Sequence, residues 1–231
     1  MRAIDEIYTT CPFYGSRRIQ AELNRREYAI GRKKVTSLMT KLGIQAIYPK
    51  PRTSLANAQH KKYPYLLRNI DIYRPNQIWG TDITYIRLAQ GFLYLVAFLD
   101  WFSRYVISFQ LSNTLDSEFC VEALKRALTV GKPEISNSDQ GVQFTSKSFT
   151  DILEQEKIQI SMDSKGRCYD NIFTERLWRS VKYEEVYLKD YHDPLEAYES
   201  LKNYFKFYNE KRLHQSLGYK TPAEIYFQSV A

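Results

Sequence analysis

The sequence predicts an α/β fold, a mixed sheet flanked by helices, preceded by a small all-α module. The chain has 231 residues, of which 44% are hydrophobic, and this suits one medium and one small domain. Strand-like apolar runs begin only after Tyr73, and helical and strand-like segments then alternate. The basic excess lies at the start: residues 1–62 hold 13 Lys and Arg against 4 Asp and Glu, whereas the remainder holds 20 against 22.

Composition also excludes several protein classes. No run of 18 or more apolar residues and no charged–apolar–small leader is present, so we expect neither a membrane span nor a secretory peptide. Cys11, Cys120 and Cys168 lie far apart and form no C-x-x-C pair, which argues against zinc or dithiol chemistry and fits a reducing cytosol. The net charge of +7 favours a polyanionic partner.

The first 46 residues predict a basic helix-turn-helix-like module. A first helix is expected over 16–26, with Ser16 as its cap, and a second over 32–42, ending at Gly43. Apolar residues of the second helix recur every three or four positions and should pack on the first: Val35, Leu38, Met39 and Leu42. The cations left outside are Arg17, Arg18, Arg25, Arg32, Lys33 and Lys34. They predict contacts to DNA phosphates; the alternative is a solvated basic face.

A connector is expected over 47–77, because Pro49, Pro51, Pro64 and Pro75 favour extended backbone there. The rest, 78–231, has the size of a catalytic domain with a C-terminal helical tail. Strands are predicted over 78–86, 92–99, 105–111, 135–138 and 158–161, and helices over 116–130, 146–156 and 172–187. Three antiparallel strands followed by alternating helices and strands form the ribonuclease-H-like plan.

Three acids stand at useful places in that plan. Asp82 lies on the first strand, Asp139 follows the fourth, and Glu175 falls in the first turn of the late helix. The 35 residues between the second and third acids can return the chain to the same edge of the sheet. Carboxylate oxygens are the ligands that Mg²⁺ prefers, and a metal pair suits phosphodiester chemistry. We therefore predict a metal-binding catalytic trio.

Cations accompany the third acid. Arg179 and Lys182 follow Glu175 at i+4 and i+7, so all three share one helical face. This pattern indicates DNA-phosphate contacts beside a metal ligand, with a surface salt-bridge ladder as the alternative. Two further residues are predicted to be structural: Asp100 as the cap of a turn, and His214 in a packing or hydrogen-bonding role.

Several strings carry a family resemblance: Trp79–Tyr85 (WGTDITY), Leu99–Arg104 (LDWFSR), Ser138–Gly141 (SDQG), Lys165–Asn171 (KGRCYDN) with Glu175, and Tyr208–Leu217 (YNEKRLHQSL) followed by Thr221-Pro222. Together they resemble bacterial insertion-sequence transposases with a retroviral-integrase-type core. The nearest type is the second reading-frame product of the family-three insertion sequences. The stretch Tyr14–Ile19 is similar to that family's helix-turn-helix, so the resemblance covers nearly the whole chain.

The resemblance implies a D,D-35-E triad on Asp82, Asp139 and Glu175, a Mg²⁺ cofactor that Mn²⁺ can replace, and contact of Lys182 with a DNA end. It also implies DNA strand cleavage and strand transfer by a multimer assembled on the element's ends, in the cytoplasm of a bacterium. One position departs from the family: Asn137 stands where His is usual, two residues before the second acid.

Two other functions stay open at this point. One is a metal-dependent nuclease with the same fold, and the other is a catalytically silent DNA-binding regulator. The resemblance further implies that the first reading-frame product, alone or fused to this chain, supplies a specificity helix-turn-helix and a coiled coil. The recognised end sequence and the target preference do not follow from the sequence.

Overall fold

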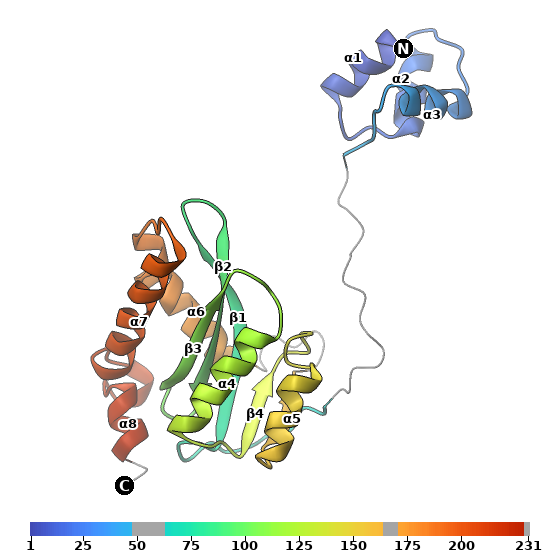
Figure 1. The fold of residues 1–231 in the computed structure, drawn as a ribbon. Coiled ribbons are helices and arrows are strands. Elements are labelled where there is room, and N and C mark those ends of the chain that lie inside the picture. The colour runs from blue at the N-terminus through green and yellow to red at the C-terminus, as the bar shows by residue number, and fades with distance from the viewer. Residues whose placement is uncertain (48–62, 164–170, 229–231) are drawn as a thin grey trace. The chain divides into compact units, whose positions relative to one another are not determined.

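The computed structural model describes residues 1–47, 63–163 and 171–228, and the chain divides into two compact units, Met1–Ala58 and Gln59–Ala231 (Figure 1). Part of the predicted connector, residues 48–62, lies outside the described residues. The predicted boundaries at 46 and 77 stay predictions. None of the described helices combines the length and the apolarity needed to cross a membrane.

The N-terminal unit is a three-helix cluster: α1 (Arg2–Thr10), α2 (Ser16–Arg25) and α3 (Arg32–Lys41). Its core consists of the residues buried by all three helices: Ile4, Ile7, Ile19, Leu23, Val35 and Met39. The sequence did not predict α1, whose only buried residues are Ile4 and Ile7. The predicted capping by Ser16 is wrong, because Gly15 is the N-cap of α2 and no side chain caps this helix.

The C-terminal unit is built on a five-stranded mixed sheet in the order β3-β2-β1-β4-β5. The strands are β1 (Ile78–Arg87), β2 (Phe92–Asp100), β3 (Val106–Ser112), β4 (Ile135–Ser138) and β5 (Gln159–Met162). The first three pair antiparallel, and β4 and β5 add to β1 in parallel. This confirms the predicted ribonuclease-H-like sheet. Most strand ends differ by one residue from the predicted ends, and the others agree.

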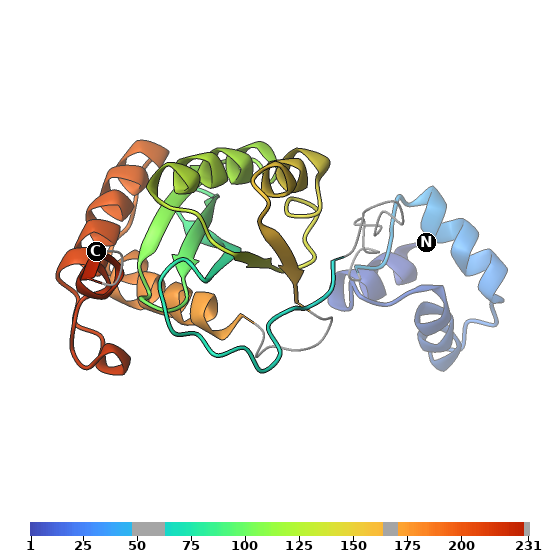
Figure 2. The same ribbon diagram turned by 90° about the horizontal axis from the view of Figure 1, so that it is seen from below.

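Helices cover both faces of this sheet (Figure 2). On one face lie α4 (Glu118–Val130) and α5 (Lys147–Gln155), which share a core with Trp79, Val96 and Phe98. On the other lie α6 (Ile172–Glu184) and α7 (Pro194–Glu210), which pack against the opposite side chains of β1 and β2. The remaining elements are the short helices η1 (Val186–Leu188), η2 (Gln215–Leu217) and α8 (Pro222–Gln228).

Gly80 is the place where α6 and the sheet come closest. A Cβ built on Gly80 would lie 2.2 Å from the Trp101 indole Nε1 and 2.8 Å from Thr174 Oγ1. Thr174 is a fully buried residue in the first turn of α6, and Trp101 follows β2 directly. The glycine of the WGTD string is therefore required by packing, since any side chain would push α6 away from β1.

We expect Gly80→Ala to destabilise the C-terminal unit by about 1–3 kcal/mol, the usual cost of forcing an extra carbon into a packed core. The matched control is Gly31→Ala, where no atom lies within 4 Å of the added Cβ. Thermal and denaturant unfolding of the full chain measures both. Equal stability of the two variants would contradict this account of Gly80.

Candidate active site

Asp82 and Asp139 occupy equivalent positions on neighbouring parallel strands. Gly80 of β1 pairs with Asn137 of β4, so each acid comes two residues beyond this pair along its chain. Adjacent strands lie about 4.8 Å apart. The alternation of β1 turns Gly80 and Asp82 toward the face that α6 covers. The two carboxylates thus leave the same region of the sheet, Asp82 from within β1 and Asp139 directly after β4 ends.

The helix α6 is tied to Asp82 by a hydrogen bond. The indole Nε1 of Trp178 donates to Asp82 Oδ2 at 2.9 Å. Glu175 precedes Trp178 by three residues, so both side chains lie on one face of the helix. The carboxylate of Glu175 is exposed and belongs to the first turn of α6. Seating of α6 on β1 therefore brings the third predicted acid to the side of the sheet on which Asp82 lies.

The charges of the three acids act on one another. The pKa of Asp82 is raised from 3.8 to about 6, chiefly by burial, with further increases from the charges of Asp139 and Glu175. The hydrogen bond from Trp178 opposes this by stabilising the charged form. Partial desolvation also raises the pKa of Asp139, although its side chain keeps contact with solvent, and the backbone N–H of Gly141 counteracts this with a 2.9 Å hydrogen bond.

The chemistry of this set fits a hard divalent cation. All three candidate metal ligands are carboxylates, and no described cation forms an ion pair with any of them. A bound cation would relieve the repulsion between their charges. Over the described ranges, however, no group of three or more His, Cys, Asp or Glu is already gathered closely enough to hold a metal. Without a metal, hydrogen bonds from Trp178 and Gly141 orient the carboxylates of Asp82 and Asp139.

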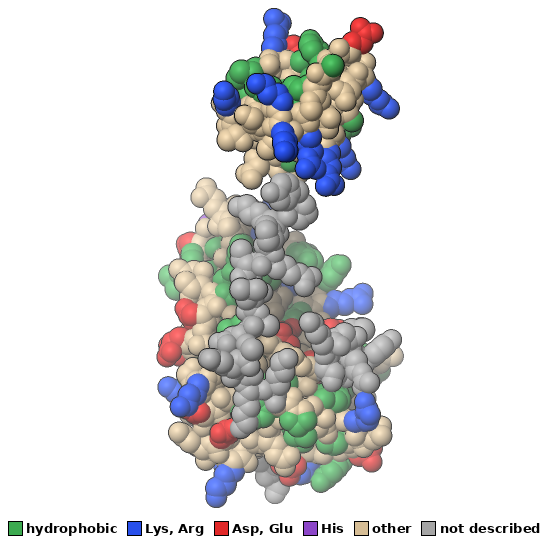
Figure 3. Space-filling model, turned by 90° about the vertical axis from the view of Figure 1, so that its right-hand side faces the viewer, with side chains coloured by type: hydrophobic (Ala, Val, Ile, Leu, Met, Phe, Trp, Pro, Cys, Tyr) green, Lys and Arg blue, Asp and Glu red, His purple; other side chains and the backbone are tan. Residues whose placement is uncertain are grey.

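The predicted DNA-contact residues are on the surface. On α6, Arg179 is exposed and lies over the ring of Tyr183, and Lys182 is half-buried one turn further on. In the N-terminal unit all six cations predicted to contact phosphates are exposed, and none of them forms an ion pair within residues 1–47: Arg17, Arg18, Arg25, Arg32, Lys33 and Lys34. Figure 3 shows Lys and Arg side chains at several places on the visible face of this unit, more prominently than Asp and Glu. These positions suit phosphate contact, and the DNA contacts themselves stay predictions.

Asp100 has the structural role that the sequence predicted. Asp100 is fully buried and accepts hydrogen bonds from the backbone N–H groups of Asn76 and Ser103, which confirms its role in the turn. Asn137 is also fully buried, and its amide donates to Asp163 Oδ1 at 2.8 Å. The side chain that departs from the family thus joins β4 to the residue after β5. The string Lys165–Asp170 lies outside the described residues.

Sequence reasoning missed Trp178, which makes the contact between α6 and Asp82. Its spacing of three residues from Glu175 was a usable signal, because it placed an indole donor on the helix face of the acid. The spacing alone gave no acceptor, since Asp82 lies 96 residues away. Gly80 was visible as part of a string, but its close neighbours Trp101 and Thr174 were not.

Asp82→Asn should stabilise the metal-free protein at neutral pH. A carboxyl with a pKa raised to about 6 disfavours the folded state when it is charged, so stability rises as pH falls from about 6 toward 3.8. We expect a gain of about 1–3 kcal/mol at neutral pH and little near pH 4. Asn retains an oxygen that accepts from Trp178.

Denaturant unfolding in EDTA at the two pH values measures this difference. Asp190→Asn is the control, because Asp190 is an exposed acid without a hydrogen bond or ion pair in the described part of the chain. A variant that is no more stable than the parent at neutral pH would show that the charged carboxylate of Asp82 does not destabilise the folded state.

Comparison with known proteins gives the same picture from sequence and from fold. Family models described as an integrase core domain match residues 72–168 and 156–222, and a model of an HTH-like domain matches residues 1–52. An uncharacterized 31 kDa protein of insertion element IS600 from Shigella sonnei is 31% identical over 94% of this chain and 84% of its own length. The transposase for insertion sequence element IS904 from Lactococcus lactis is 30% identical over 92% of this chain and 87% of its own length.

The fold is shared with retroviral integrases. The catalytic core domain of HTLV-2 integrase, solved in complex with magnesium, aligns with 67% of this chain and 97% of its own at a TM-score of 0.52 and 21% identity. That identity supports the fold alone. The sequence relatives, among them the InsF transposases of IS3 elements in Escherichia coli, span nearly the whole chain. The chain belongs to the insertion-sequence transposases of the IS3 and related types, which are built on an integrase core.

Proposed function

We propose that this transposase cleaves and transfers DNA strands with Asp82, Asp139 and Glu175 as its catalytic acids. The observation that carries the proposal is the electrostatic coupling of Asp82, on β1, to an acid after β4 and an acid on α6. Three separate elements thereby direct negative charge into one region, next to a helix with exposed cations. The arrangement matches what phosphodiester transfer needs: oxygen ligands for a cation and a path for a polyanion.

The side chains divide the work between them. Trp178 fixes the carboxylate of Asp82 through its indole N–H, and the N–H of Gly141 fixes that of Asp139. Glu175 is exposed on the first helical turn and is free to adjust to the substrate. A bound divalent cation, Mg²⁺ or Mn²⁺ in its place, would activate water or a DNA 3′-hydroxyl and stabilise the leaving oxygen. No protein nucleophile is required.

DNA contacts are assigned to both units. Arg179 and Lys182 lie on the same face of α6 as Glu175 and would neutralise phosphates of the strand being cut. The exposed cations of the N-terminal unit would add positioning contacts that carry little sequence information. Because the proposed substrate is DNA, we also propose that the protein acts in the bacterial cytoplasm.

Assembly into a homo-oligomer on DNA belongs to the same proposal. It is supported by two solved relatives of the fold: the HTLV-2 integrase core in a dimeric form and a simian T-cell lymphotropic virus intasome, to which 97% of this chain aligns at a TM-score of 0.60. Association with a first reading-frame product stays a prediction from the family resemblance.

Glu175→Gln should abolish strand cleavage and joining, with a loss of at least about 1000-fold, because the exchange removes a charged ligand and keeps the shape of the side chain. The control is Asp190→Asn, an exposed acid away from the site. The assay incubates the protein with labelled DNA from either side of its coding region, in Mg²⁺ or Mn²⁺, and separates cut and joined strands on denaturing gels.

The products distinguish the alternatives. Joined strands from a supplied 3′-hydroxyl end support a transposase, whereas cut strands without joining indicate a nuclease. Loss of joining in Glu175→Gln but not in the control supports the assignment of the acid. A protein that binds DNA and neither cuts nor joins under any cation would be the silent regulator, and the proposal would fall.

Trp178→Phe should lower the rate of cleavage by about 10- to 100-fold and raise the metal concentration for half-maximal activity, as expected when a group that orients a metal ligand is lost. Trp101→Phe is the matched control, because it removes an indole N–H that has no hydrogen-bond partner in the described structure. Cleavage rates across a Mg²⁺ titration measure both. Equal losses in the two variants would reduce Trp178 to a packing role.

A further inference from the structure

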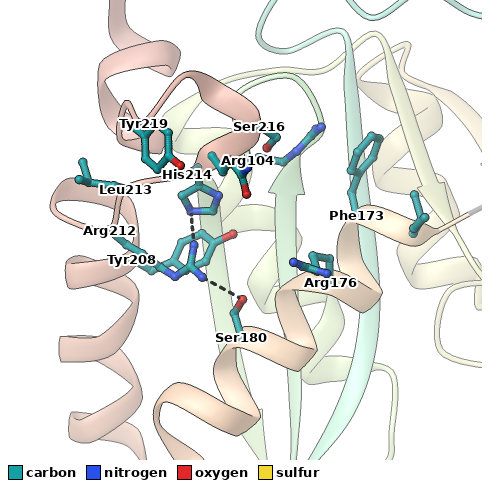
Figure 4. Close-up of a pocket in the computed structure, with 12 residues that line it drawn as sticks. Arg104, Phe173, Arg176, Ser180, Tyr208, Arg212, Leu213, His214, Ser216 and Tyr219 are labelled. Carbon is teal, nitrogen blue, oxygen red and sulfur yellow. Dashed lines mark hydrogen bonds between the residues drawn. The ribbon is translucent and has the colours of Figure 1, made fainter.

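A cavity of about 730 Å³ opens between α6 and the C-terminal segment 208–219 (Figure 4). Its lining includes three arginines from three parts of the chain, Arg104 after β2, Arg176 on α6 and Arg212 after α7, together with Tyr208 and His214. Among the residues that the structure describes, no acidic one lines it. Arg176 directly follows Glu175, so the cavity faces a side of α6 about 100° away from the catalytic face. We name this cavity the arginine pocket.

One of the arginines is held by the protein. The guanidinium of Arg212 forms a two-pronged ion pair with Glu184, through Nε to Oε2 at 2.7 Å and Nη2 to Oε1 at 2.6 Å. Its Nη1 lies 3.1 Å from Nε2 of His214. A guanidinium only donates, so Nε2 accepts and the hydrogen of the neutral imidazole is on Nδ1. Burial lowers the pKa of His214 to about 4, which agrees with a neutral ring.

The charges of the other two arginines are balanced less completely. In the described part of the chain neither Arg104 nor Arg176 forms an ion pair, and the buried Nη1 of Arg104 has no hydrogen-bond partner. All three guanidinium groups lie close enough to Tyr208 to act on its hydroxyl electrostatically, which shows that they converge on one region. The backbone of Arg104 is also held at a φ of 63°, an unfavourable conformation for a residue with a side chain.

These features cost stability, and the described structure offsets the cost only in part, through the backbone N–H of Arg104, which donates to the Asp100 carbonyl, and the contact of its guanidinium with Phe173. A buried donor without a partner and a side chain in the left-handed region both disfavour the folded state. Burial also lowers the pKa of Arg104 to about 10, since its charge is only partly balanced. An anion in the pocket would supply both the missing acceptor and the missing charge. Paired guanidinium groups bind phosphate in particular, because their N–H groups match its oxygens.

The rim of the pocket adds a second kind of surface. Ile172, Leu213 and Tyr219 are exposed by 48%, 60% and 64% and line the same cavity. The face of Phe173 is occupied by Arg104, whose guanidinium carbon lies 3.6 Å from the ring centroid. An apolar, partly aromatic rim beside cations suits a nucleobase next to its phosphate, and a base is free to enter only when it is unpaired.

We propose that the arginine pocket binds an unpaired nucleotide of a DNA strand, its phosphate on Arg104 and Arg176 and its base along Tyr219. The proposal rests on the proposed function for its DNA substrate and deepens it, because it adds a second strand-binding site on the helix that carries Glu175. A duplex offers phosphates but no accessible base, so the pocket prefers strands that are frayed or already cut.

The test is photocrosslinking of the full chain to a short single strand of thymidine nucleotides that carries one 5-bromodeoxyuridine, in EDTA so that no chemistry occurs. Crosslinked residues are located by mass spectrometry, which separates the pocket from the cations of the N-terminal unit. We expect crosslinks at Tyr219 or its neighbours in the pocket. Arg176→Ala should reduce them about tenfold, the value of one charge-assisted contact.

Two further variants decide between a pocket and a merely basic surface. Lys125→Ala removes one exposed charge from α4, on the opposite face of the sheet, and should leave the pocket crosslinks within twofold, an effect of about 0.4 kcal/mol. Ser216→Leu fills part of the pocket without changing charge and should reduce them as Arg176→Ala does. Far-UV circular dichroism and thermal melting verify that each variant folds.

Crosslinks that fall outside the pocket, or that decline equally in Arg176→Ala and Lys125→Ala, would overturn the proposal. So would an unchanged yield in Ser216→Leu. Glu175→Gln should crosslink like the parent while failing to cut DNA, so that loss of the pocket and failure of the proposed catalysis give different results. Duplex DNA of the same composition should compete at least tenfold less well than the single strand, a difference of about 1.4 kcal/mol.

Discussion

The seating of α6 on β1 is the contact on which the site depends. It is possible because position 80 has no side chain, so that Thr174 and Trp101 fill the space where a Cβ would be. One turn further along the helix, Trp178 reaches Asp82 with its indole N–H. Packing against Gly80 and the hydrogen bond to Asp82 thus both fix the position of α6 on the sheet. Among the described residues no side-chain hydrogen bond or ion pair holds Glu175 near the sheet, so its place follows from the seating of α6.

Unfavourable electrostatics are concentrated at the two sites for which DNA contact is proposed. Asp100, buried completely, is surrounded by donors in its turn, whereas Asp82 is left partly buried beside two further negative charges. Arg212 has a carboxylate partner, whereas Arg104 lacks one. Strain and unpaired charge that persist in a packed domain are typical of sites that acquire their partner from outside. The two places where they occur lie on adjacent faces of α6.

Most of the fold followed from the sequence because its strands are buried and alternate regularly. The β1 and β2 runs are so apolar that their ends are fixed to within a residue, and the order of elements then leaves few topologies. The three acids were predicted from their positions within that order, and their catalytic role stays a prediction. The helix α1 did not, because two isoleucines are a weak pattern, and Ser16 was misjudged because Gly15 already supplied the extended residue before α2. The arginine pocket combines Arg104, Arg176 and Arg212, from three separate segments of the chain, and no local sequence pattern indicates that such segments meet.

The first turn of α6 also limits how this family of enzymes can vary in length. Thr174 faces the sheet, Glu175 the cation site and Arg176 the pocket, and successive residues of a helix are separated by about 100°. One residue inserted ahead of Thr174 within that turn would rotate Glu175 toward the arginines, and one residue deleted there would rotate it toward Gly80. Point substitutions keep the directions in which the side chains of this turn point, but a change of length does not. Insertions and deletions among relatives are therefore expected in exposed turns such as residues 89–91.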